Sequence, residues 1–204
     1  MNNEIDKAFE ITKKEKRPAL ISFTVAGDNT SKKSFEILKS ISNTVDIAEW
    51  GIAFNCPGAD GPEIQNSSYR AIKNGITLDS TFSLIKKYKK LRNSKPLILM
   101  GYYQLIYNYG EKKFIKKCKN VGVAGLIVVD LPWPDNRSFA KLCKKNSICF
   151  VQLIAPTTTK KRMKLIVKDS HQLIYQISNI NITGGKLKST AKIILNNYKT
   201  IKSI

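Results

Sequence analysis

The chain has 204 residues, 42% of them hydrophobic and 25% charged, and its 35 Lys and Arg against 15 Asp and Glu give a formal net charge of +20. This composition excludes an intrinsically disordered chain, and the length predicts a single domain over residues 1–204. No apolar stretch is long enough to suggest a membrane span, and residues 1–18 do not resemble a signal peptide, so we expect a cytoplasmic protein.

The positive charge is spread over several segments of the chain. In each of them lysines alternate with Leu, Ile or Phe, which is typical of the solvated face of an amphipathic helix; the segments are Lys86 to Lys90, Lys112 to Lys117 and Lys186 to Lys202. Nucleic-acid binding is therefore the weakest functional hypothesis, and a steep salt dependence of DNA binding would support it.

The four cysteines are unevenly spaced and form no C-x-x-C pair, and His171 is the single histidine. Neither a disulfide framework nor a metal site is predicted from this pattern.

Short apolar runs alternate with longer amphipathic stretches along the chain, which predicts repeated strand–helix units around a parallel sheet. The predicted strands are Ala19 to Val25, Val45 to Glu49, Pro96 to Met100, Gly125 to Val129, Ile148 to Leu153 and Leu173 to Ile177. The predicted helices are Lys32 to Ser42, Leu78 to Arg92, Glu111 to Val121, Asp135 to Asn146, Lys160 to Lys168 and Thr190 to Ile201.

Six such units fit an open doubly wound sheet or a barrel. The first strand is not followed by G-x-G-x-x-G, and no phosphate-binding loop motif occurs, which favours an α/β fold of the (β/α)8 TIM barrel type. The longest segment after a strand runs from Trp50 to Thr77, on the side where barrels carry their chemistry. Eight units take about 250 residues, so we expect a barrel that lacks units seven and eight, as a fragment or, less favoured, a natural truncation.

Two carboxylates, Glu49 at the predicted end of the second strand and Asp60 in the segment after it, are the candidate catalytic residues. Alternation along the strand places Glu49 on the same side as Val45 and Ile47, where burial would raise its pKa and suit it to proton transfer. A satisfied polar residue is an equally good interpretation of Glu49 alone. Asp60 alone is better explained as a turn residue that bonds its own backbone. The presence of two carboxylates that could converge on one pocket favours a functional role for both.

A string of residues around these carboxylates resembles the tryptophan synthase alpha chain family. It comprises Glu49, Gly51, Ile52, Phe54, Pro57, Ala59, Asp60, Gly61, Pro62, Ile64 and Gln65. Further collinear matches extend from Ala19 to Gly184, among them Ala26-Gly27-Asp28, Leu99 to Tyr103, Gly122 to Pro132 and Ala155 to Thr158.

The resemblance implies a barrel enzyme that cleaves indole-3-glycerol phosphate to indole and glyceraldehyde 3-phosphate, without a metal or cofactor in this subunit. Glu49 would be the general acid and base, and Asp60 would accept the indole N–H and stabilise positive charge. The residues that would bind the substrate are Phe23, Tyr102, Val129 and Leu153 around the indole ring, Tyr175 beside Asp60, and Thr183 and Gly184 in a mobile loop.

The resemblance also implies a partner, a beta subunit that carries pyridoxal phosphate, in an alpha-beta-beta-alpha complex. The surface facing it would include Phe54 to Asp60 and Tyr102 to Gly110. Within it, Cys56 replaces a family aspartate and Gly58 a larger apolar residue, which puts coupling to the partner in doubt.

The chain ends before the seventh and eighth strands, whose loops would supply most of the donors to the substrate phosphate, so weak substrate binding is expected. An inactive fragment that at most docks on the beta subunit is the alternative function.

Overall fold

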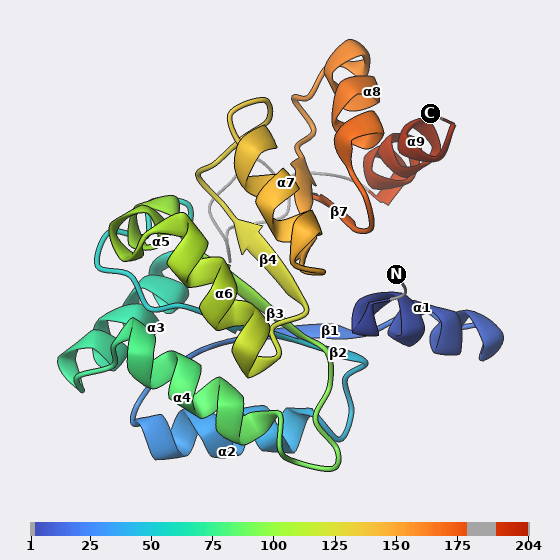
Figure 1. Ribbon diagram of the computed structural model, residues 1–204. Coiled ribbons are helices and arrows are strands. Elements are labelled where there is room, and N and C mark those ends of the chain that lie inside the picture. Colours follow the sequence, from blue (N-terminus) through green and yellow to red (C-terminus); the bar gives the residue numbers. More distant parts are fainter. Residues whose placement is uncertain (1–2, 179–190, 204) are drawn as a thin grey trace.

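A computed structural model describes residues 3–178 and 191–203, in which strands and helices alternate (Figure 1). The strands are β1 (Ile21–Val25), β2 (Ile47–Gly51), β3 (Leu97–Gly101), β4 (Gly125–Val128), β5 (Cys149–Phe150), β6 (Gln152–Ile154) and β7 (Ile174–Gln176). The helices are α1 (Glu4–Lys14), α2 (Ser31–Ile41), α3 (Pro62–Lys73), α4 (Leu78–Tyr88), α5 (Tyr103–Tyr109), α6 (Glu111–Val121), α7 (Arg137–Lys145), α8 (Lys160–Asp169) and α9 (Ala191–Lys202).

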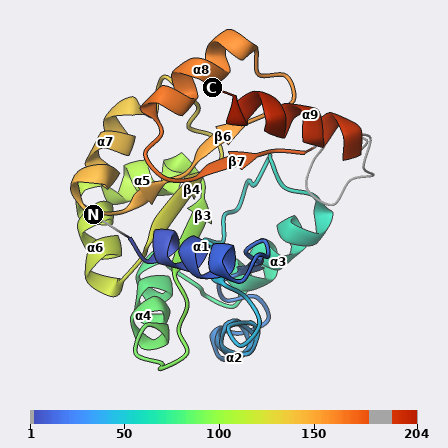
Figure 2. The same ribbon diagram turned by 90° about the vertical axis from the view of Figure 1, so that its right-hand side faces the viewer.

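The strands pair in parallel and in chain order, as the sequence predicts. β1 to β5 form one sheet, and β6 and β7 form a second. The predicted fifth strand divides between them, because the backbone N–H of Val151 donates to Leu126 in β4 whereas that of Gln152 donates to Leu173 beside β7. The chain thus passes from one sheet to the next within a single apolar run, and Figures 1 and 2 show the wall of strands curving there.

Helices cover the outer face of this wall, and Figure 1 shows α2, α4, α6 and α7 following one another along it. The core between them and the strands is built from fully buried aromatic and aliphatic side chains, including Trp50, Phe82, Phe114, Phe139 and Phe150. Burial on both faces explains why the strands read as almost continuous apolar runs.

The inner face of the wall holds a second core, which α1 closes at the amino ends of the strands. Ile5 of α1 packs there against Ile47 and Ile98. A Cβ on Gly125 would lie 2.9 Å from Cδ1 of Ile5, so the bare backbone at this position makes room for the helix. The amide of Asn3 fixes the start of α1 by donating to the carbonyl of Ala124 at 2.9 Å.

Three helices, α1, α3 and α5, were not predicted from the sequence, and α3 lies inside the expected long loop from Trp50 to Thr77. The buried face of α3 consists of Ser67, Ser68 and Ala71, so the helix has little apolar stripe for a periodicity search to find. It begins instead at Gly61 followed by Pro62, a favoured first helical residue.

No helix within residues 3–178 and 191–203 has the length and apolar character needed to cross a membrane.

Candidate active site

Glu49 lies in the middle of β2 and not at its end, which corrects the sequence expectation. Parallel pairing continues to Gly51, and in the sheet Glu49 lies between Phe23 of β1 and Ile98 of β3. Its neighbour Trp50 packs in the outer core and Ile47 in the inner one, so alternation places Glu49 on the inner face.

The side chain of Glu49 is almost completely buried. Its exposed fraction is 8%, and burial raises the pKa of its carboxyl group to about 7. A carboxylic acid with a pKa near neutrality is present in both protonation states at physiological pH, so it can give a proton and take one back.

Two aromatic residues lie near this carboxyl group. Gly51 follows Glu49 on the same face, and a Cβ there would come within 2.7 Å of Cζ of Phe23, so the ring of Phe23 occupies the space that Gly51 leaves open. Burial and the charge of Glu49 raise the pKa of Tyr175 in β7. Tyr175 is therefore within electrostatic reach of Glu49, and its predicted position beside Asp60 stays a prediction.

Asp60 is held in the segment that leads from β2 into α3. The backbone N–H of Asp60 donates to the carbonyl of Pro57 at 3.0 Å, and the side-chain amide of Gln65 donates to the backbone carbonyl of Asp60 at 2.8 Å. The side chain is 4% exposed and accepts a hydrogen bond from the hydroxyl of Tyr102 at 2.9 Å. Burial raises the pKa of the Asp60 carboxyl, and the Tyr102 hydroxyl partly opposes that rise.

Tyr102 joins this segment to the end of β3. Its hydroxyl oxygen also accepts from the backbone N–H of Ala59 at 3.0 Å, and its ring stacks on Phe54 with centroids 4.8 Å apart. The sequence identified Tyr102 as a wall of the indole slot, whereas its polar contacts and the stacking on Phe54 were not anticipated. The structure thus adds a role in positioning Asp60.

Replacing Tyr102 with Phe is expected to lower kcat/KM about tenfold and to raise the pKa of Asp60. The substitution leaves the partly buried N–H of Ala59 and the buried carboxylate of Asp60 without their shared partner, which costs about 1–3 kcal/mol of stability. A pH profile of kcat/KM and a urea unfolding curve would measure both effects. Tyr69→Phe removes a hydroxyl from a side chain that is 66% exposed and serves as the control; an unshifted profile in Tyr102→Phe would remove the positioning role.

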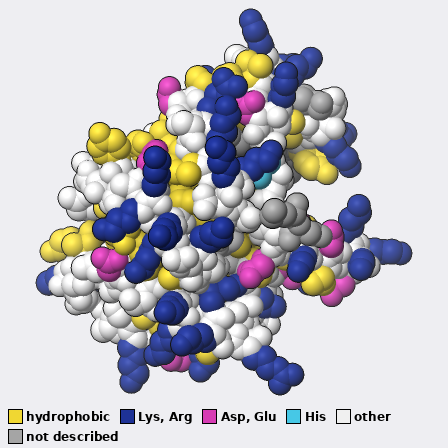
Figure 3. Space-filling view, viewed as in Figure 1, with side chains coloured by type: hydrophobic (Ala, Val, Ile, Leu, Met, Phe, Trp, Pro, Cys, Tyr) yellow, Lys and Arg dark blue, Asp and Glu magenta, His cyan; other side chains and the backbone are white. Residues whose placement is uncertain are grey.

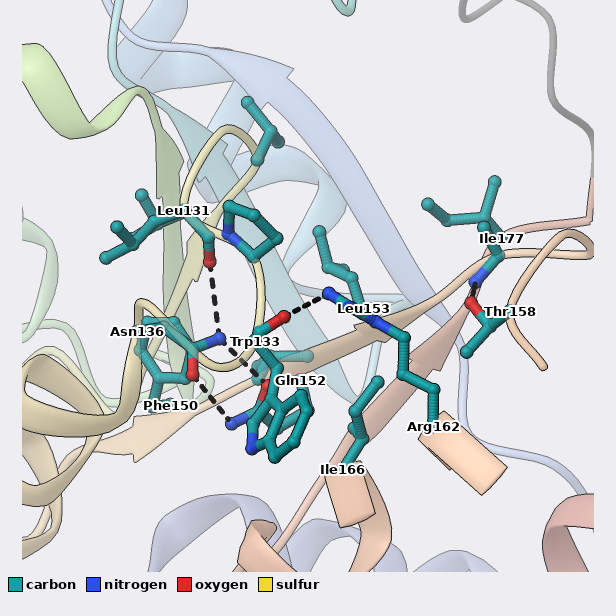
Figure 4. Close-up of a pocket in the computed structure, with 15 residues that line it drawn as sticks. Leu131, Trp133, Asn136, Phe150, Gln152, Leu153, Thr158, Arg162, Ile166 and Ile177 are labelled. Atoms are coloured by element: carbon teal, nitrogen blue, oxygen red, sulfur yellow. Dashed lines mark hydrogen bonds between the residues drawn. The ribbon is translucent and has the colours of Figure 1, made fainter. Parts of the chain in front are cut away.

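Val129 and Leu153, also predicted to contact the indole ring, both line a cavity of about 200 Å³ between the ends of β4 and β6. Figure 4 shows Leu153 there together with the paired amides of Asn136 and Gln152 and with Arg162, whose guanidinium donates to the carbonyl of Trp133. The cavity wall includes neither Glu49 nor Asp60.

The two segments predicted to face a partner lie next to each other. A hollow of about 440 Å³ is lined by residues 52–55, by parts of α3 and α4, and by Gln104, Leu105 and Asn108 of α5. Cys56 is exposed as a free thiol. Tyr107 is 69% exposed, so α5 presents an aromatic side chain to solvent.

Thr183 and Gly184 lie outside the described residues. Within the described part of the chain, no three His, Cys, Asp or Glu side chains are grouped so that they could hold a metal ion. Gly51 and Phe54 belong to the string of residues that carries the family resemblance, but neither was predicted to contact the substrate; the structure places Gly51 against Phe23 and Phe54 against Tyr102.

Comparison with known proteins identifies close relatives. The family model described as "Tryptophan synthase alpha chain" matches residues 9–203. The chain is 57% identical over 200 residues to the tryptophan synthase alpha chain of Pelagibacter ubique, a match that covers 98% of this chain and 76% of that protein. It is 38% identical over 185 residues to the tryptophan synthase alpha chain of a Thermoanaerobacter species, covering 90% of this chain and 70% of the relative.

Solved structures share the fold. The tryptophan synthase alpha chain of Legionella pneumophila superposes with a TM-score of 0.87 at 27% identity, over 97% of this chain and 73% of that one. A chain from the tryptophan synthase a2b2 complex of Pyrococcus furiosus gives a TM-score of 0.82 at 32% identity, over 91% and 74%. These matches confirm the predicted barrel architecture, and the chain belongs to the tryptophan synthase alpha chain family.

Proposed function

We propose that this chain is the lyase that cleaves indole-3-glycerol phosphate to indole and glyceraldehyde 3-phosphate, the step that supplies indole for tryptophan synthesis. The observation that carries the proposal is the buried carboxyl group of Glu49, whose pKa of about 7 suits it to move protons on the inner face of the barrel.

The cleavage requires two proton transfers, and one carboxyl group can perform both. Protonated Glu49 would give its proton to the ring carbon that carries the glycerol chain, which leaves positive charge on the ring nitrogen. The Glu49 carboxylate would then take the proton of the neighbouring glycerol hydroxyl. The carbon–carbon bond breaks as the aldehyde forms, its electron pair restores the aromatic ring, and Glu49 ends protonated, ready for another turnover.

Asp60 would accept the indole N–H and stabilise the positive charge that the ring nitrogen carries between the two transfers. One carboxylate oxygen of Asp60 is engaged by the Tyr102 hydroxyl at 2.9 Å, which restricts the rotation of the side chain. A preorientated carboxylate does not have to reorganise when the charge develops, and this is the source of its catalytic effect.

The remaining site residues are proposed as the walls and the cover of the indole slot. Phe23, Tyr102, Val129, Leu153 and Tyr175 would contact the ring. Thr183 and Gly184 would close over the substrate, with the Thr183 hydroxyl on Asp60 and the Gly184 N–H toward the phosphate. Exclusion of water by such closure would strengthen the electrostatic effect of Asp60.

The proposed partner is a tryptophan synthase beta subunit that carries pyridoxal phosphate and condenses indole with serine, and the proposed assembly is alpha-beta-beta-alpha. Support comes from the relative in the Pyrococcus furiosus a2b2 complex and from the contact between the two segments predicted to face a partner. Because Tyr102 touches both Phe54 and Asp60, docking on these segments would act directly on the position of Asp60.

The direct test is release of indole from indole-3-glycerol phosphate by the purified chain, alone and with a beta subunit loaded with pyridoxal phosphate. We expect release above that of the beta subunit alone, and faster release in the mixture because docking would order the Asp60 segment. A folded chain that binds the substrate but releases no indole under either condition would contradict the proposed activity.

A further inference from the structure

We propose that a hollow between α7 and α8, on the outside of the barrel, binds a phosphate group. The hollow has a volume of about 220 Å³. It is lined by Arg137, Ala140, Lys141, Lys144, Gln152, Lys168, Asp169 and His171. None of the residues assigned to the cleavage reaction is among them, so this binding site is independent of the proposed catalytic function.

The charge of the hollow is strongly positive. Arg137, Lys141 and Lys144 project from successive turns of α7, and Lys168 comes from the last turn of α8. Figure 3 shows Lys and Arg side chains over the face that carries α7 and α8, as over the rest of the visible surface. Several cations around one hollow attract a multiply charged anion more strongly than a chloride ion.

The single carboxylate in the hollow does not neutralise these cations. Asp169 accepts a hydrogen bond from the indole N–H of Trp133 at 2.8 Å and pairs with Nε of Arg137 at 3.0 Å. The Trp133 hydrogen bond is the largest cause that lowers the pKa of Asp169, and the charges of Arg137 and Lys141 lower it further. Within the described residues, Lys141, Lys144 and Lys168 have no carboxylate within 4.0 Å, the limit for an ion pair.

A buried side chain that carries a hydrogen-bond donor, Gln152, lines this hollow and also the cavity of Figure 4. Gln152 is 2% exposed, and its side-chain oxygen accepts from the amide of Asn136 at 3.0 Å. Its nitrogen contacts the Asn136 oxygen at 3.5 Å, which occupies one of the two hydrogens that an amide nitrogen carries. Among the described residues, no hydrogen bond uses the second hydrogen, and in the proposed site it would donate to a phosphate oxygen.

His171 provides a built-in reporter of binding. Burial and the charge of Lys144 lower the pKa of its imidazole, while Asp6 and a backbone hydrogen bond with Ile148 act in the opposite direction. A phosphate dianion placed in the hollow would favour the charged imidazolium, so binding should raise this pKa. The chain has one histidine, so its resonance needs no assignment once any affinity tag has been removed.

The experiment is a titration with inorganic phosphate at constant ionic strength, followed by the proton NMR signal of His171. We expect a saturable shift and a rise of about one unit in the His171 pKa. The double variant Lys141→Gln/Lys144→Gln should bind at least about tenfold more weakly, as expected for two lost charge-assisted contacts. Lys112→Gln/Lys116→Gln on the exposed face of α6 removes the same charge elsewhere and should bind as tightly as the unchanged chain.

Three results would overturn the proposal: a shift that does not saturate, equal weakening in both double variants, or tighter binding of a short single-stranded DNA that the two variants weaken alike. The last result would assign the positive charge to a diffuse nucleic-acid surface. Indole release should be unchanged in both double variants, so failure of this proposal is distinguishable from failure of the cleavage assignment.

Discussion

Replacement of Glu49 by Gln is expected to lower kcat for indole release about 1,000-fold or more, since removal of a general acid and base typically costs 100- to 10,000-fold. The amide keeps the size of the side chain but can neither give the proton to the ring carbon nor take the hydroxyl proton. Substrate affinity should change little, because Phe23 and the other walls of the slot remain. Single-turnover assays combined with substrate titration would separate the two quantities.

The same variant is expected to be more stable than the unchanged chain at alkaline pH. Burial raises the pKa of Glu49 from 4.5 to about 7, so the folded protein holds this proton more tightly than the unfolded chain does. Ionisation above pH 7 therefore favours unfolding, by on the order of 3 kcal/mol, and this penalty disappears below the unfolded pKa. Gln carries no such penalty, so the difference between the urea unfolding curves should be present at pH 8 and small at pH 4.5.

Glu63→Gln is the matched control for both readouts, because Glu63 is an exposed residue in the first turn of α3. It should leave turnover and the pH dependence of stability unchanged. Retained turnover in Glu49→Gln would contradict the assignment of Glu49 as the general acid and base. Lost turnover together with lost stability at alkaline pH would show that Glu49 acts as a structural residue.

The strands of this barrel could be predicted because each is buried on both faces and therefore appears in the sequence as a short, continuous apolar segment. The run from Ile148 to Leu153 also shows the limit of that signal: its division into β5 and β6 at Val151 depends on which neighbouring strand accepts each N–H. Hydrogen bonds between segments distant in the chain leave no local pattern. The helix α3 could not be predicted for a different reason: its buried face consists of Ser67, Ser68 and Ala71, so the local sequence has little apolar periodicity.

The candidate site was predictable where strand alternation places a residue on a face. The position of Glu49 on the inner face follows from the period of two and from the burial of Ile47. The hydrogen bond between Asp60 and Tyr102 joins residues 42 positions apart, and only the parallel packing of β2 against β3 brings them together. The turn-forming residues around Asp60 instead predicted that its carboxylate would hydrogen-bond to the neighbouring backbone.

These two carboxylates differ in their surroundings in the way that a division of roles requires. Burial is the first cause of the raised pKa in both, but Asp60 also has the Tyr102 hydroxyl, which favours its ionised form. Glu49 has no such donor among the causes of its shift. The group without a donor is therefore the better proton carrier, and the group with one is the better fixed charge.

Replacement of Asp60 by Asn is expected to lower kcat about 100-fold while KM changes by less than about threefold, because the amide oxygen can still accept the indole N–H, whereas the lost negative charge acts most strongly when the ring nitrogen becomes positive. The amide oxygen can still accept from Tyr102, so the Asp60 segment should keep its position and the free energy of unfolding should stay close to that of the unchanged chain. Steady-state kinetics and a urea unfolding curve would test both statements.

Asp135→Asn, which removes an exposed carboxylate just before α7, is the control for the loss of one negative charge and should retain full activity. A rise in KM with unchanged kcat in Asp60→Asn would mean that Asp60 only holds the substrate. Unaltered kinetics would remove it from the site. A selective loss of kcat, combined with an intact fold, is the result that a fixed charge at the ring nitrogen requires, because a negative charge there lowers the barrier only while the nitrogen is positive.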